Sequence, residues 1–112
     1  MKPDQFTEEH MIGVLRIYRK NCGPGVLVDR YIENPRAILE NITSAEFYDG
    51  FAIGSNWDLR SKLKFSIDEN GEVIPKFNPH LDPRCRGTES DKEATEAGEK
   101  FQKEALEYLS KF

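Results

Sequence analysis

The residue types in this sequence that most often carry chemistry are its cysteines and histidines, and their spacing does not predict a metal site. The chain contains Cys22 and Cys85 together with His10 and His80. Zinc motifs place two cysteines a few residues apart, or two histidines one helical turn apart, and this sequence contains neither arrangement. We therefore expect no metal site and no cofactor.

Cys85 and His80 form the one local pair that could act as a nucleophile and its base. The flanking Arg84 and Arg86 favour the reactive thiolate form of Cys85. Catalysis also needs a fixed geometry and an orienting group, and a separation of five residues within a loop provides neither. We expect the protein not to be an enzyme, and a thiol enzyme centred on Cys85 is the third of three functional hypotheses.

A row of basic residues predicts a different kind of site, which binds an anionic or acidic partner. Arg60, Lys62 and Lys64 alternate with apolar or small residues, as is typical of a strand. Because successive side chains of a strand point to opposite faces, the basic side chains should share one face. The alternative is a solvated sheet face, where lysines protect against aggregation. The predicted partner- or ligand-binding residues are Tyr48, Trp57, Arg60, Lys62, Lys64, Arg84 and Arg86.

The elements that must position these residues begin with an N-terminal helix. After Thr7, apolar residues recur at helical spacing until Gly23-Pro24-Gly25 ends the pattern. The pair Asn34-Pro35 predicts the start of a second helix over residues 35–42. Residues 26–33 between them are apolar and fit either a helix or a strand, so this segment is left open.

The next part of the chain predicts an antiparallel sheet. Candidate strands cover residues 47–53, 59–67 and 72–77, and residues 68–71 (Asp-Glu-Asn-Gly) predict a hairpin turn. Proline has no backbone donor, so Pro75 places the last of these strands at an edge. That edge could pair with a second copy of the chain, and a homodimer through the strand near Pro75 is therefore considered.

A long helix is predicted at the C-terminal end. Ser90 and Glu93 have the spacing of a capping box, and the helix continues as an apolar stripe: Ala94, Ala97, Phe101, Ala105, Tyr108, Leu109 and Phe112. The predicted fold class is α+β, with two N-terminal helices, an antiparallel three-strand meander and a long C-terminal amphipathic helix packed on the sheet. Residues 1–112 are expected to form a single domain.

The composition narrows the range of partners and compartments. The chain has 112 residues, with 20 acidic and 16 basic side chains and a net charge of -4. This balance disfavours a nucleic-acid partner, because nucleic-acid binders usually carry a strongly basic surface. No apolar run approaches the roughly 20 residues of a membrane span, and the first residues lack the pattern of a secretory signal. We expect a soluble cytoplasmic protein without membrane association.

Small size, acidity and the lack of a catalytic constellation favour a binding protein. The first hypothesis is a small soluble non-catalytic protein that binds and inhibits or neutralises another macromolecule, of the immunity-protein, antitoxin or phage-inhibitor type. The alternative is an oligomeric binder of a small anionic ligand such as a nucleotide. In that alternative the arginines and lysines would hold the charge, and Trp57 or Tyr48 would stack on the ligand.

Overall fold

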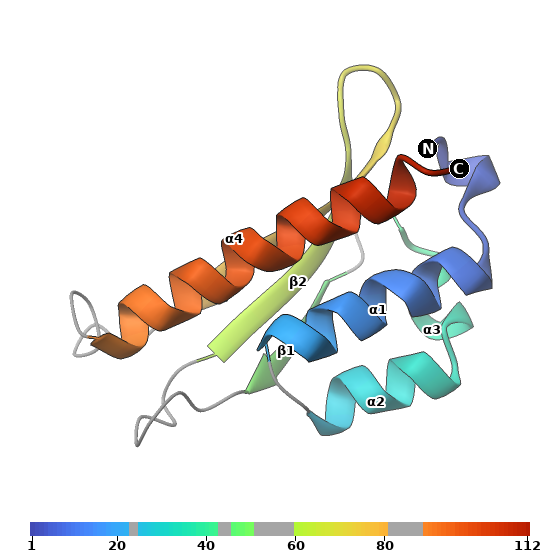
Figure 1. The fold of residues 1–112 in the computed structure, drawn as a ribbon. Helices are drawn as coiled ribbons and strands as arrows, with labels where there is room; N and C mark the ends of the chain where they lie inside the picture. Colours follow the sequence, from blue (N-terminus) through green and yellow to red (C-terminus); the bar gives the residue numbers. More distant parts are fainter. Residues whose placement is uncertain (23–24, 43–45, 51–59, 81–88) are drawn as a thin grey trace.

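The structure is a computed structural model that describes residues 1–22, 25–42, 46–50, 60–80 and 89–112 (Figure 1). A short 3-10 helix, Pro3–Gln5, comes first. The main elements in chain order are α1 (Glu8–Cys22), α2 (Val26–Glu33), α3 (Arg36–Leu39), β1 (Glu46–Gly50), β2 (Arg60–Ile67), β3 (Val73–His80) and α4 (Glu89–Leu109). The α+β class is confirmed, and so is the packing of the long C-terminal helix on the sheet (Figure 1).

The number of helices before the sheet differs from the prediction of two. The segment left open between helix and strand forms α2, and the predicted helix over residues 35–42 is reduced to α3 and a following turn. Val28 of α2 is fully buried, and Leu27, Tyr31 and Ile32 are partly buried against the same core. This spacing matches one face of a helix, and contact with α1 rather than intrinsic preference decides the conformation.

The strands are antiparallel, and β2 lies between β1 and β3. The predicted hairpin of β2 and β3 is confirmed, with β3 extending to His80 rather than ending at residue 77. Asp68 closes the turn, because its Oδ1 atom accepts hydrogen bonds from the backbone N–H groups of Asn70 and Glu72 at 2.9 and 2.8 Å. Gly71 has a φ of 76°, a left-handed conformation that glycine adopts without strain. Residues 51–53 and Leu59, which were predicted to be extended, lie outside the described residues.

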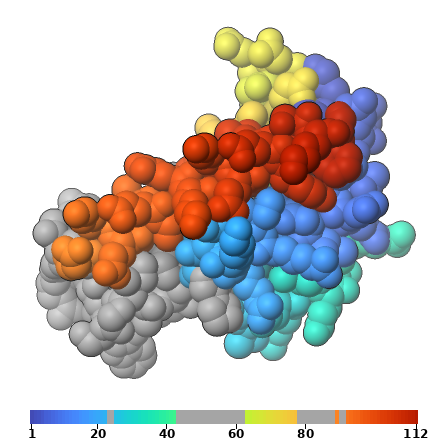
Figure 2. Space-filling model, in the orientation of Figure 1, coloured from blue at the N-terminus to red at the C-terminus, as the bar shows by residue number. Residues whose placement is uncertain are grey.

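One face of the sheet is packed against the helices. Figure 2 shows α4 and α1 lying side by side over this side of the molecule. The side chains that meet there alternate along the strands: Leu63 and Phe65 from β2, and Val73, Pro75 and Phe77 from β3 are all buried. We call these five residues the packed face.

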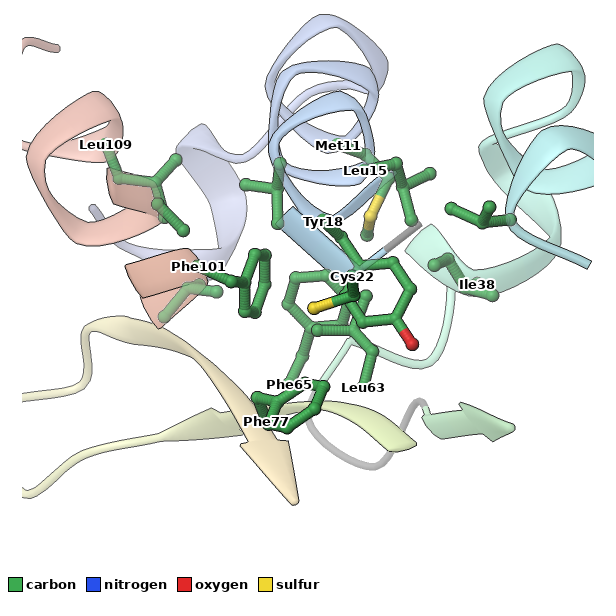
Figure 3. Close-up of a cluster of buried hydrophobic side chains, with 14 of the residues drawn as sticks. Met11, Leu15, Tyr18, Cys22, Ile38, Leu63, Phe65, Phe77, Phe101 and Leu109 are labelled. Atoms are coloured by element: carbon green, nitrogen blue, oxygen red, sulfur yellow. The ribbon is translucent and has the colours of Figure 1, made fainter. Parts of the chain in front are cut away.

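Aromatic rings join the packed face to the helices (Figure 3). The rings of Tyr18 in α1 and Phe101 in α4 meet edge to face with their centroids 5.3 Å apart. α4 lies close to β3 at Gly98, where an added methyl group would overlap the ring of Phe77. The predicted stripe on α4 is correct at Ala94, Phe101, Ala105 and Leu109, which are buried. It is wrong at Phe112, which is 64% exposed because the helix ends at Leu109.

Candidate binding face of the sheet

The strand register brings the predicted basic residues together on the second face of the sheet. Arg60, Lys62 and Lys64 alternate in β2 with residues of the packed face, so they belong to the opposite face. Tyr48 of β1 is directly opposite Lys62 and belongs to that same face. The register thus assigns four of the seven predicted residues to positions on one face, and their role in binding stays a prediction. Trp57, Arg84 and Arg86 lie outside the described residues.

The register adds residues that the sequence prediction missed. Lys76 is opposite Lys64, Asn78 is opposite Lys62, and His80 is opposite Arg60. We define the cationic face as the alternate positions that the register places together: Glu46, Tyr48 and Gly50 of β1, Arg60, Lys62, Lys64 and Ser66 of β2, and Ile74, Lys76, Asn78 and His80 of β3. The hairpin turn carried enough information to find Lys76, because it fixes which residues of the two strands are opposite each other.

Two lysines of this face, Lys64 and Lys76, are described with their side chains. Lys64 and Lys76 are cross-strand neighbours, and like charges in that position repel each other. Lys64 is partly buried, Lys76 is exposed, and among the described side chains neither forms an ion pair. Glu46 is opposite Lys64 on its other side and is the one carboxylate residue that the register places on this face. The face therefore retains capacity for added negative charge.

Ion pairs among the helices connect one helix to another. Arg19 of α1 contacts Asp29 of α2, with Nε and Oδ1 2.9 Å apart. Lys20 of α1 contacts Glu104 of α4, with Nζ and Oε2 3.3 Å apart. Each of these pairs joins two helices. Arg19 and Lys20 are therefore already paired with carboxylates of the same chain.

The resolved pKa shifts also belong to the helical side of the molecule. Hydrogen bonds from Asn21 and Lys20 lower the pKa of the Glu104 carboxyl. Burial raises the pKa of the Tyr108 hydroxyl, and nearby Glu9 raises it further. Glu8 accepts a hydrogen bond from Arg36 and raises the pKa of its guanidinium. These shifts follow from packing and helix-to-helix pairing, so they do not indicate a catalytic acid or base.

The residues considered for metal or thiol chemistry are not brought together in the described part of the chain. Cys22 is buried in the core on α1, whereas His80 belongs to the cationic face. His10 lies at the start of α1, where Nδ1 accepts a hydrogen bond from the backbone N–H of Thr7 at 3.1 Å. No group of three or more potential metal ligands occurs among the described residues. Cys85 lies outside them, so the thiol hypothesis remains a prediction.

The outer edge of β3 has no free backbone donor between residues 73 and 79, and the predicted homodimer through the strand near Pro75 stays a prediction. In an antiparallel strand alternate residues direct N–H and C=O to the same side, and here residues 73, 75, 77 and 79 face outward. The Val73 N–H donates to the Met1 carbonyl at 2.8 Å, and the Phe77 N–H donates to Gln102 Oε1 at 3.3 Å. Pro75 and Pro79 have no N–H to donate. A second copy would therefore find no available backbone donor along this edge.

A shallow hollow occurs between α2 and α3, away from the sheet. It is lined by Leu27, Arg30, Tyr31, Glu33, Asn34 and Ala37. Its mixed charges do not select a ligand class. The described helices include none that is long and apolar enough to cross a membrane.

The comparisons with known proteins add no assignment to this geometry. The chain matches no protein-family model, and no curated protein or solved structure is significantly similar to it. The functional conclusions below therefore depend on the two faces of the sheet and on general physical chemistry.

Proposed function

We propose that this chain is a small non-catalytic binding protein that acts by occupying another macromolecule through the cationic face of its sheet. The observation that supports this most directly is the division of β2. Leu63 and Phe65 are fully buried, while Lys64 between them belongs to the cationic face. In the part of the chain that the structure describes, Lys76 on this face is exposed and Lys64 and Ile74 are partly exposed, so these positions are available to a partner.

The shape of this surface suits a macromolecule. From Arg60 to Lys64 the cationic face extends about 13 Å along β2, and it spans about 10 Å across the three strands. A sheet face is broad and shallow, whereas most small-molecule sites are concave and enclose their ligand. We propose an inhibiting or neutralising role in the cytoplasm, since a protein of this size can block a partner simply by covering its surface.

The direct test is a comparison of partner retention by two matched variants. In the face variant, Arg60, Lys62 and Lys64 are each replaced by Gln. In the control variant, Lys92, Lys100 and Lys103, which are exposed on α4, are each replaced by Gln. Both variants lose the same charge. We expect the wild type and the control to retain a stoichiometric partner from native lysate, and the face variant to lose it.

Two results would contradict the proposal. One is a wild-type protein that stays monodisperse and retains no partner from its native lysate. The other is a partner retained equally by the face variant and the wild type. Circular dichroism and thermal unfolding of both variants establish that any loss of binding is not a loss of folding.

A second candidate function is binding of a small anion such as a nucleotide. The cross-strand pair Lys64 and Lys76 supports it, because an anion placed between two ammonium groups would relieve their repulsion. A ligand that binds only the folded state raises the melting temperature. A thermal-shift panel of nucleotides should then stabilise the wild type more than Lys76→Gln. No shift at millimolar concentration would exclude this candidate.

A further inference from the structure

We infer that the partner presents a carboxylate-rich protein surface to the cationic face, with a carboxylate over Lys76. This inference rests on the proposed function and identifies the chemistry of the partner. It follows from the order of charges across the sheet, from the apolar residue at one end of the face and from the small extent of the positive region.

The order of charges across the sheet shows where a carboxylate is missing. One row of the register reads Glu46, Lys64, Lys76 from β1 to β3. Lys64 thus has a carboxylate residue on one side and a second lysine on the other. The described residues provide no carboxylate partner for Lys76, which is exposed. An added carboxylate there would continue the alternation of charge and remove the repulsion between the two lysines.

The neighbouring row adds an apolar contact. It consists of Ser66 opposite Ile74, and Ile74 is partly exposed on this face. Protein interfaces combine apolar spots with a polar surround. Nucleic-acid surfaces are read mainly through phosphates and base edges, for which an isoleucine offers little. The combination of Lys76 and Ile74 therefore favours a protein.

The small extent of the positive region also disfavours nucleic acid. A duplex carries one negative charge per about 1.7 Å of its axis and continues beyond any footprint of this size. The chain as a whole has a net charge of -4, which does not favour a polyanion as its partner. A folded protein can present a compact acidic patch that ends where the face ends. Charge complementarity of this kind speeds association and selects the partner.

The test uses a short peptide of alternating glutamate and serine as a probe, labelled for fluorescence anisotropy. The controls are the same peptide with glutamine in place of glutamate, and a short oligothymidylate. At low salt we expect the glutamate peptide to bind and the glutamine peptide not to bind. Binding should weaken as ionic strength rises, because the Debye length falls to about 8 Å near physiological salt.

Matched variants then locate the contact. Lys76→Gln should weaken binding of the glutamate peptide by about tenfold, which corresponds to one lost charge contact of roughly 1.4 kcal/mol. Lys76→Arg should retain it, and Lys103→Gln on α4 should leave it unchanged. In NMR spectra, the amide shifts caused by the peptide should concentrate at residues 62–66 and 74–78.

Four results would overturn the inference: no binding of the glutamate peptide, tighter binding of oligothymidylate, equal binding of the glutamine peptide, or an unchanged affinity in Lys76→Gln. Failure of the inference is distinguishable from failure of the proposed function. A native partner that the wild type retains and the face variant loses, together with no binding of the glutamate peptide, would sustain the function and refute the carboxylate chemistry. Absence of any retained partner would refute the function itself.

Discussion

The two faces of β2 differ in burial and in charge. Phe65 is fully buried, and its ring lies 6.0 Å from that of Phe6, centroid to centroid. Lys64, the preceding residue, lies on the opposite face of the sheet. Lys76 of the neighbouring strand is directly opposite it. One face is stabilised by the exclusion of water, whereas on the other face Lys64 and Lys76 form no ion pair with any side chain that the structure describes. We propose that stability and binding depend on alternate residues of this single strand.

This division implies that the two properties can be changed separately. Substitutions on the packed face should unfold the protein and affect binding only through unfolding. Substitutions on the cationic face should affect binding and leave the fold intact. The predictions below test this separation, from the largest expected effect to the smallest.

The largest effect is expected from truncation in the packed face. Phe65→Ala should lower the free energy of unfolding by about 3–5 kcal/mol, because it removes buried apolar surface and leaves a cavity. Lys64→Ala, one residue away, should change it by no more than about 0.5 kcal/mol. Urea unfolding followed by circular dichroism measures both. Comparable losses of unfolding free energy in the two variants would contradict the distinction between the faces.

Two glycines sharpen the comparison within the packed side. A methyl group at Gly98 would overlap the ring of Phe77, a buried residue of β3. Gly98→Ala should therefore destabilise the protein by about 1–3 kcal/mol. At Gly13 the added methyl group would meet only the outer end of the Tyr108 side chain, which is partly exposed. That ring can shift, and alanine gains about 1 kcal/mol of helix propensity over glycine. Gly13→Ala should therefore be close to neutral in thermal unfolding.

The hydrogen bond between Phe77 and Gln102 at the outer edge of β3 provides a third test. Gln102→Ala should cost about 1 kcal/mol, because it removes the acceptor for the Phe77 N–H. The variant also exposes a backbone donor at the edge. Analytical ultracentrifugation should then show more self-association than in the wild type. A variant as stable as the wild type would show that this hydrogen bond contributes nothing.

The smallest effect concerns the helices and depends on pH. Hydrogen bonds from Asn21 and Lys20 lower the pKa of Glu104 in the folded state. Their stabilisation should thus be fully present above the unfolded carboxyl value of about 4.3 and should be lost as pH falls through the lower folded value. Glu104→Gln should slightly reduce stability at neutral pH and leave stability in acid unchanged. An equal difference from wild type at both pH values would contradict this assignment.

The local pattern of the sequence is enough to predict several elements of the fold. The buried face of α1, at Met11, Val14, Leu15 and Tyr18, follows directly from helical spacing. The hairpin at residues 68–71 follows from two residues. The side chain of Asp68 accepts a hydrogen bond within the turn, and Gly71 adopts a left-handed conformation without strain. The buried stripe on α4 was also predicted correctly until the helix ended. Each of these features depends on residues close together in the chain.

The candidate site could be predicted only in part. The alternation in β2 was sufficient to assign Arg60, Lys62 and Lys64 to one face. Lys76 was missed because its place beside Lys64 depends on the pairing of two strands. The hydrogen bond from the Phe77 N–H to Gln102 was missed for a similar reason, because Gln102 belongs to α4 and Phe77 to β3. Contacts between distant segments do not appear in the periodicity of either segment.

The sequence by itself determined the alternation of β2, the turn that follows it and the amphipathic character of α1 and α4. These depend on backbone geometry that repeats every two residues in a strand and every 3.6 residues in a helix. Tertiary structure alone decided that residues 26–33 become a helix against α1 and that Phe112 lies outside the core. The physical reason is that burial and electrostatic repulsion depend on which surfaces meet, and that is settled only when the whole chain packs.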